Sequence, residues 1–162
     1  MRRLTAVLFA ACALALLGPT TPPARAACTV PTFTYKHEVV TFTEGGAATR
    51  VQVEIADTEA AREVGLMCRT ALAPDAGMLF VFEDITRDPF WMKDTLIPLS
   101  IAFIDNAGHI VGLLDMAVAA DPENGPFPTY GPKNQYRYAL EVNQGFFAQH
   151  GIDAKAQVSF TP

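Results

Sequence analysis

Apolar and polar residues alternate along several short stretches of the chain, and this period of two predicts a protein built mainly from β-strands. In TRVQVEIA (residues 49–56), Val51, Val53 and Ile55 fall on one face, as in a strand with one buried side. The continuous apolar run MLFVFE (78–83) indicates a strand covered on both faces. Further strands are expected at residues 31–42, 89–92, 138–142 and 156–160.

The clearest local pattern is LSIAFIDNAGHIVGLLDM (99–116), which predicts two strands joined by a turn at residues 105–108. The following segment, residues 117–137, has no helical or strand period and carries four prolines. A loop of this length in a compact domain is typical of a lid, a binding loop or a linker, and its tyrosines argue against a bare linker.

Two short helices are also expected. In residues 58–67 apolar side chains recur at helical spacing, and Asp57 or Thr58 can cap the first turn. Residues 143–152 predict a second helix with Asn143 as its cap. About seven strands and two short helices indicate a mainly β fold, a single compact jelly-roll or barrel-like domain with the helices at its ends.

The first residues have the pattern of a signal peptide. Arg2 and Arg3 precede an apolar run at residues 4–17 that is too short to span a bilayer, and Ala24-Arg25-Ala26 fits a cleavage site. We therefore expect a secreted or periplasmic protein, with a retained N-terminal anchor as the alternative. The expected organisation is a signal peptide at residues 1–26, an extension with a first strand at 27–49, and a β domain at 50–162.

The charge of the chain excludes two classes of partner. It has 12 Lys and Arg against 17 Asp and Glu, a net charge of −5, and loss of the three arginines in residues 1–26 leaves −8. So acidic a chain disfavours nucleic acid and anionic membranes as partners. No segment after residue 26 is long enough to span a membrane, and we expect a monomer.

Two cysteines remain once Cys12 leaves with the signal peptide. An even pair in an oxidising compartment favours a disulfide between Cys28 and Cys68, which would tie the mature N-terminus to the domain. Two free thiols or two soft metal ligands are the alternatives. On the chain-entropy account, closing a loop of about 40 residues stabilises the fold by roughly 3–4 kcal/mol.

One ordered set of motifs carries a family resemblance. It runs through REVGLMCRTALAPDAGMLFVFE (62–83), FWMKDTLIPLSIAFIDNAGHIVG (90–112) and YALEVNQGFFAQHGI (138–152). These stretches resemble the bacterial and archaeal family called domain of unknown function 192, over about residues 50–160. The resemblance implies a compact, mostly β, jelly-roll-like fold, and it implies no particular function.

The chain departs from the family pattern at three positions. Asp94 replaces the Asn that many relatives carry after the lysine, and Ser100 replaces an Asp. Both changes weaken the case for a strict Lys-Asn pair or for a carboxylate at position 100. Cys68 stands where relatives carry an aromatic residue or His, which fits a disulfide particular to exported members. Arg69 belongs to the motif itself, unlike an ordinary surface charge.

The sequence lacks the familiar catalytic and metal-binding motifs. It has no G-x-S-x-G elbow, no H-E-x-x-H helix and no phosphate-binding glycine loop. The three histidines are far apart and have no carboxylate or cysteine at ligand spacing. Thioether and thiol groups could suit Cu(I), but each methionine lies in an apolar run typical of core packing: Met67, Met78, Met92 and Met116. We expect neither a metal site nor a cofactor.

Six residues form the candidate ligand-binding set: Arg69, Trp91, Lys93, Asp94, Thr95 and Glu141. On a strand, Trp91 and Lys93 share one face, which suits an anionic or polar ligand, while Phe90 and Met92 share the other. The alternative is an exposed Trp91 stacked under the aliphatic stem of Lys93. Glu141 lies between apolar neighbours on its strand, so we expect it to point away from the apolar side.

These residues favour one function and leave two alternatives open. If Arg69 and Lys93 converge with Glu141 beside Trp91, they form a small polar cleft roofed by residues 119–137. We favour a non-catalytic extracytoplasmic module that binds a small anionic or polar ligand there. A structural or protein-interaction domain of the cell envelope is the first alternative.

The second alternative is a hydrolase-type enzyme. In that case Glu141 or Asp94 would act as acid or base, and Lys93 or Arg69 would stabilise negative charge. The sequence assigns no catalytic residue.

Overall fold

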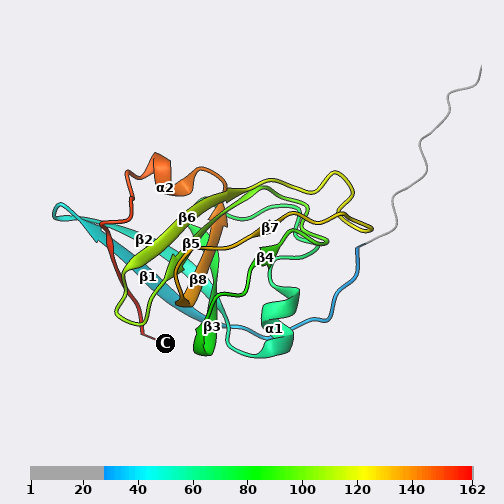
Figure 1. The fold of residues 1–162 in the computed structure, drawn as a ribbon, viewed down its shortest axis with the longest axis horizontal. Coiled ribbons are helices and arrows are strands. Elements are labelled where there is room, and N and C mark those ends of the chain that lie inside the picture. Colours follow the sequence, from blue (N-terminus) through cyan, green and yellow to red (C-terminus); the bar gives the residue numbers. More distant parts are fainter. Residues whose placement is uncertain (1–27, 162) are drawn as a thin grey trace, which may run out of the picture.

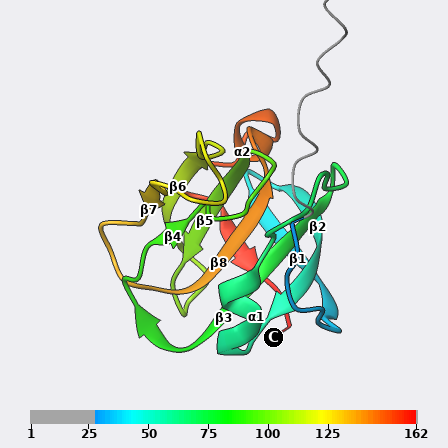
Figure 2. The same ribbon diagram turned by 90° about the vertical axis from the view of Figure 1, so that its right-hand side faces the viewer.

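The computed structural model describes residues 28–161, and the expected signal peptide at residues 1–26 lies outside them. The chain folds into a mainly β domain with two short helices, which confirms the predicted fold class (Figure 1). The helices lie at opposite ends of the sheet, as Figure 1 and Figure 2 show from perpendicular directions. No helix within the described residues has the length and hydropathy needed to cross a bilayer.

Seven strands form one sheet that curls into a half barrel, in the order β6-β5-β8-β3-β2-β1-β9. Their bounds are β1 Lys36–Glu44, β2 Ala47–Ala56, β3 Ala76–Thr86, β5 Leu99–Ile104, β6 Ile110–Met116, β8 Tyr136–Asn143 and β9 Gln157–Ser159. Strands β2 and β3 run parallel, and the other neighbouring pairs in this sheet are antiparallel. A second sheet has two short strands, β4 Phe90–Trp91 and β7 Thr129–Tyr130.

The two edges of the large sheet meet at one end. A single bridge pairs His109 with Gln157 of β9, and the Val158 N–H donates to the Gly108 carbonyl over 2.9 Å. Gly108 has a φ of +83°, and a Cβ atom there would stand 2.4 Å from the Val158 carbonyl oxygen. The contact therefore depends on glycine, and it gives the curled sheet its barrel-like character.

The helix α1 (Glu59–Val64) lies in the connection between the parallel strands β2 and β3. Parallel neighbours need a long crossover, because a tight turn can join only antiparallel strands. The Thr58 hydroxyl caps the helix by accepting from the Ala61 N–H over 3.2 Å, which confirms one of the two predicted caps. The helix ends at Gly65, which has a φ of +49°.

The second helix, α2 (Phe146–Gln149), begins differently from the prediction. Gly145 is its N-cap, in the left-handed conformation, and no side chain caps the helix. The Asn143 amide instead donates to the carbonyls of Leu72 and Ala73, over 3.2 and 2.9 Å. The prediction that Asn143 caps α2 is therefore wrong, because this side chain fastens the end of β8 to the turn before β3.

Apolar side chains cover both faces of the large sheet. The first cluster contains Leu140 and Val142 of β8 together with residues of β1, β2 and α2. The second cluster contains Tyr136 and Ala139 of β8 together with residues of α1, β3 and β5. Glu141 shares a face with Ala139 and so points toward the second cluster. The prediction that Glu141 points away from the apolar side is wrong, because the opposite side is apolar too.

Residues 117–137 contain β7 and are fastened to the strand that carries the candidate site. Strand β7 pairs with β4 through Phe90 with Tyr130 and Trp91 with Thr129. This part of the chain therefore forms one wall of the region around Trp91.

A disulfide joins Cys28 to Cys68, as predicted, so neither sulfur is a free thiol or a metal ligand. The Cys68 N–H donates to the Asp94 carbonyl over 2.8 Å, and the Asp94 N–H donates to the Pro122 carbonyl over 2.7 Å. These contacts connect the N-terminal segment, the turn after α1, the segment after β4 and the proline-rich loop.

Candidate functional site

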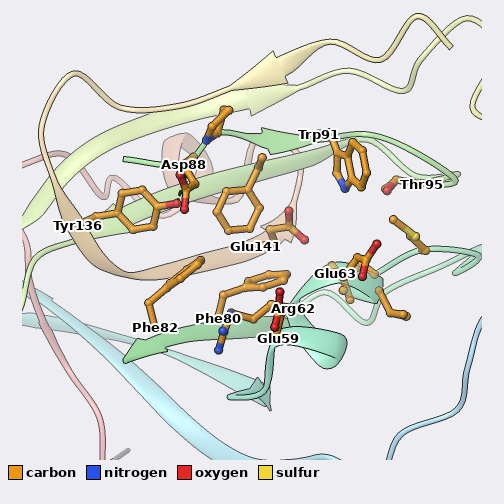
Figure 3. A pocket seen from close by; sticks show the side chains of 16 residues that line it. Glu59, Arg62, Glu63, Phe80, Phe82, Asp88, Trp91, Thr95, Tyr136 and Glu141 are labelled. Carbon is orange, nitrogen blue, oxygen red and sulfur yellow. Dashed lines mark hydrogen bonds between the residues drawn. The ribbon is translucent and has the colours of Figure 1, made fainter. Parts of the chain in front are cut away.

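A cavity of about 390 Å³ lies between α1, β3, β4 and β8 (Figure 3). Its lining combines aromatic rings, carboxyl groups and one guanidinium: Glu59, Arg62, Glu63, Val64, Gly65, Leu66, Met67, Phe80, Phe82, Asp88, Pro89, Phe90, Trp91, Thr95, Tyr136 and Glu141. Cavities that bind small molecules have such volumes and are mostly apolar with a few polar groups. This cavity is the candidate functional site.

Aromatic rings brace one another along its walls. The ring centroids of Phe80 and Phe90 are 4.9 Å apart, and those of Phe82 and Tyr136 are 5.4 Å apart, both pairs edge to face. The Tyr136 hydroxyl donates to the Asp88 carbonyl over 2.6 Å, so its polar end is satisfied. Burial raises the pKa of Tyr136, and the ring remains a neutral part of the wall.

Glu141 brings a buried carboxyl into the cavity from the middle of β8. Its backbone pairs with Met78 on β3 and with Ile101 on β5, so strands flank it on both sides. The residue is 5% exposed, and within residues 28–161 its carboxyl forms no hydrogen bond or ion pair. Burial raises the pKa of Glu141 to about 8, so the carboxyl is mostly protonated at neutral pH. Figure 3 shows it among the rings, with its oxygens toward the side of Trp91.

The Arg62 guanidinium is held in place by the protein itself. Its Nη1 donates to the carbonyls of Val81 and Asp57, over 2.8 and 3.1 Å. The group also lies 5.0 Å from the centroid of the Phe82 ring, within range of a cation–π interaction. Arg62 therefore supports the wall of the cavity through its Nη1 donors and its contact with the Phe82 ring.

Three of the six candidate residues line the cavity: Trp91, Thr95 and Glu141. Trp91 is 42% exposed, and the Lys93 Nζ lies 5.4 Å from its ring centroid. This is the stacked arrangement that the alternative interpretation describes, although Trp91 also faces the cavity. Thr95 is buried, and its hydroxyl donates to the Lys93 carbonyl over 3.0 Å.

The other three candidates, Arg69, Lys93 and Asp94, do not line the cavity. Arg69 forms an ion pair with Glu54 on β2. Asp94 has a φ of +50° and serves through its backbone, which bonds to Cys68 and to the proline-rich loop. The structure thus brings Glu141 and Trp91 to one cavity and leaves Arg69 engaged elsewhere.

The sequence interpretation did not select Arg62, Phe82, Asp88 or Tyr136 as site residues. Arg62 has the pattern of a surface cation on a short helix, and Tyr136 follows a loop without periodicity. The tyrosines in and beside residues 117–137 were the one sequence signal for these positions, because they indicated that this loop packs against the domain.

The described part of the chain holds no group of three or more His, Cys, Asp or Glu side chains placed to bind a metal ion. Met78, Met92 and Met116 are buried in the second cluster, as expected of core residues, whereas Met67 is half-buried and lines the cavity. His109 pairs with Asp105 over 3.1 Å on the β5–β6 turn, away from the cavity lining.

Comparison with known proteins identifies the family of this chain but does not assign it an activity. The sequence pattern of the family DUF192, described as "Uncharacterized ACR", matches residues 40–160. No curated protein matches the chain.

Two solved structures share the fold. A protein from Sinorhizobium meliloti 1021, described as a proposed transcription regulator, has a TM-score of 0.71 and 29% identity, covering 80% of this chain and 98% of its own. A protein of unknown function from Novosphingobium aromaticivorans DSM 12444 has a TM-score of 0.70 and 27% identity, covering 88% of this chain and 99% of its own. Because the family pattern spans most of the sequence, this chain belongs to the DUF192 family.

Proposed function

We propose that this protein is a non-catalytic binding module whose cavity holds a small ligand with a polar group and an apolar body. One observation carries the proposal: the unpartnered carboxyl of Glu141 at the cavity wall. A buried polar group without a partner lowers the stability of a fold, and it is expected where a ligand supplies the missing partner.

The neighbouring residues support such a site. Trp91 and Thr95 would contact the ligand together with Glu141, and the aromatic rings would enclose its apolar part. Lys93 would position the Trp91 ring, and Asp94 would hold the surrounding segments through its backbone. Arg69 would act through its ion pair with Glu54 and make no direct contact with the ligand.

An anionic ligand has less support than a polar one. The expectation of an anionic ligand rested on two cations, Arg69 and Lys93, and neither lines the cavity. Arg62 does line it, but its Nη1 is engaged by two backbone carbonyls, and the same lining carries the carboxyl groups of Glu59, Glu63 and Asp88.

A protein-observed NMR screen of a library of small polar aromatic and aliphatic compounds tests the proposal. The oxidised mature chain should give hits that shift the indole N–H resonance of Trp91, the only tryptophan of the chain. Glu141→Gln should weaken these hits, while Glu83→Gln, an exposed change on β3 outside the cavity lining, should leave them unchanged. Hits that bind both variants and the parent equally would place the ligand elsewhere and contradict the proposal.

A second candidate function has one observation in its favour. A carboxyl whose pKa is raised to about 8 inside a cavity suits a general acid or base near neutral pH. Turnover of a screened ester, amide or glycoside by the parent and its loss in Glu141→Gln would favour the enzyme. Binding without turnover would favour the module.

The third candidate, a protein-interaction domain of the cell envelope, is favoured by the exposure of Trp91. In that case Trp91→Ala should abolish capture of an envelope protein while Glu141→Gln keeps it. The reverse dependence would favour the small-ligand site.

We also propose that the protein works outside the cytoplasm. The disulfide supports this, because such bonds persist in oxidising compartments. N-terminal sequencing of the protein from cell fractions should find a mature start near Ala27 in the periplasmic or secreted fraction. A chain that keeps its first 26 residues there would favour the retained anchor.

A further inference from the structure

The charges that line the cavity are mostly negative. Three carboxylates accompany one guanidinium there, Glu59, Glu63 and Asp88 with Arg62, and Glu141 adds a buried carboxyl that ionises only at higher pH or beside a cation. Glu59 and Glu63 are exposed and lie one helical turn apart on α1, whereas Glu141 is buried. Such a lining attracts cations and repels anions, and the attraction is strongest at the buried Glu141 once it is ionised.

The one cation of the lining does not balance this charge for a ligand. The Arg62 guanidinium donates to two backbone carbonyls and lies over the Phe82 ring. An anionic ligand would be repelled by the carboxylates of the lining, which outnumber this one guanidinium. A cationic ligand would be attracted by them and would leave the Arg62 contacts in place.

The aromatic walls favour the same choice. Phe80, Phe90 and Trp91 line the cavity together with Glu141. Aromatic faces attract ammonium groups through the ring quadrupole, and the rings also cover an apolar body. Because Glu141 is 5% exposed and has no partner among the described residues, it is available as the counter-ion of that ammonium group.

We propose that the cavity selects a small organic cation, an amine attached to an apolar body about the size of one ring, with the Glu141 carboxylate as its counter-ion. This inference rests on the proposed binding function and names the chemical class of the ligand. A cavity of about 390 Å³ accommodates a molecule of this size.

The inference predicts a specific pH dependence. In the empty cavity burial keeps Glu141 protonated up to about pH 8, and an ammonium group at that position favours its ionised form. Binding of the cation therefore releases a proton, and affinity should rise about tenfold per pH unit between pH 6 and 7.5.

Other titratable or charged groups face Glu141 across the cavity. They are Glu59, Arg62 and Glu63 on α1, Asp88 before β4 and Tyr136 on β8. Strands β3 and β5 place Met78 and Ile101 beside Glu141 and add no charge. Glu141 is the one buried residue among these carboxyl-bearing groups, so the dependence above pH 6 is assigned to Glu141.

Three probes with one ring and different charge test the inference: benzylamine, benzyl alcohol and benzoate. Their dissociation constants are measured by NMR titration of the oxidised mature chain, with the Trp91 indole resonance as the reporter. At pH 7.5 benzylamine should bind at least tenfold more tightly than benzyl alcohol, and benzoate should bind most weakly. The preference for benzylamine should fall at least fivefold in Glu141→Gln and persist in Glu83→Gln.

The outcomes separate this inference from the proposed function. If benzyl alcohol or benzoate binds in the cavity as tightly as benzylamine, the cation selectivity is wrong and the binding function stands. If none of the three shifts cavity resonances at millimolar concentration, both are wrong for ligands of this size. The pH profile of the parent protein needs no variant, and an affinity for benzylamine that is constant between pH 6 and 7.5 would overturn the role of Glu141.

Discussion

At the scale of single residues, the burial of Glu141 makes the stability of the ligand-free protein depend on pH. Its pKa is raised from 4.5 to about 8 by burial, so the folded state holds a proton that the unfolded state releases. The stability that this proton contributes is present in full below about pH 4.5 and declines as the pH rises through about 8. The neutral form of the side chain is therefore the one that the fold accommodates.

We predict that Glu141→Gln removes this dependence. At pH 5 the variant and the parent should differ by less than about 1 kcal/mol, because Gln resembles a protonated Glu in shape and charge. By pH 9 the variant should be more stable by about 4 kcal/mol, since each pH unit between the two pKa values contributes at most about 1.4 kcal/mol. Urea denaturation at pH 5, 7 and 9 measures the difference, and parallel profiles for the two proteins would contradict it.

Gly77 marks a close approach of two central strands. A Cβ atom at this position would stand 2.6 Å from the Glu141 carbonyl oxygen, so the backbones of β3 and β8 would have to move apart. Gly77→Ala should therefore destabilise the protein by about 1–3 kcal/mol, as overpacking of a core does. Gly131→Ala is the control, because its Cβ would lie 3.4 Å from Pro89 in ordinary contact, and it should change stability by at most about 0.5 kcal/mol. Equal effects of the two substitutions would contradict the explanation.

Sequence alternation placed Glu141 correctly opposite Leu140 and Val142, but it could not show what covers the other face. A period of two shows on which face of the strand a side chain lies, but it does not show what packs against that face. The ion pair of Arg69 with Glu54 could not be predicted from the sequence either, because the fold brings together two segments that are apart in the chain. Contacts of this kind are set by tertiary packing, which no local pattern contains.

At the scale of elements, local patterns predicted most strands and both helices, and they missed the pairing of β4 with β7. Two residues pair in each of these strands, too few to produce a period. Ser100 of β5 is buried and bonds to the neighbouring strand β6. Its hydroxyl donates to Asp115 on β6 and accepts from the Gly145 N–H over 2.8 Å, so a carboxylate is present beside position 100.

The disulfide gives a prediction at this scale. Cys28 and Cys68 are 40 residues apart, and their bond limits the freedom of the unfolded chain. Replacing both by serine should lower the free energy of unfolding by about 3–4 kcal/mol on the chain-entropy account. Urea denaturation measures the loss, and the parent protein treated with a reductant should show a similar one. An unchanged midpoint in both experiments would mean that the N-terminal segment contributes nothing to stability.

At the scale of the whole molecule, the two apolar clusters share the central strands of one sheet. Leu140 of β8 is fully buried in the first cluster, while its neighbour Ala139 is fully buried in the second. The bridge between His109 and Gln157 also joins the two edges of the sheet. Neither cluster can therefore lose its packing without disturbing the strands that support the other.

We predict that the domain unfolds as one cooperative unit. Leu140→Ala should cost about 2–5 kcal/mol, as large-to-small core changes do, and lower the urea midpoint. The fluorescence of Trp91, which lies at the cavity, should shift by the same amount as the far-ultraviolet circular dichroism of the sheet. Leu114→Ala, at a 37% exposed position on β6, should shift both signals only slightly. If the Trp91 transition stays at its original midpoint while the dichroism shifts, the two clusters unfold separately and the shared strands do not couple them.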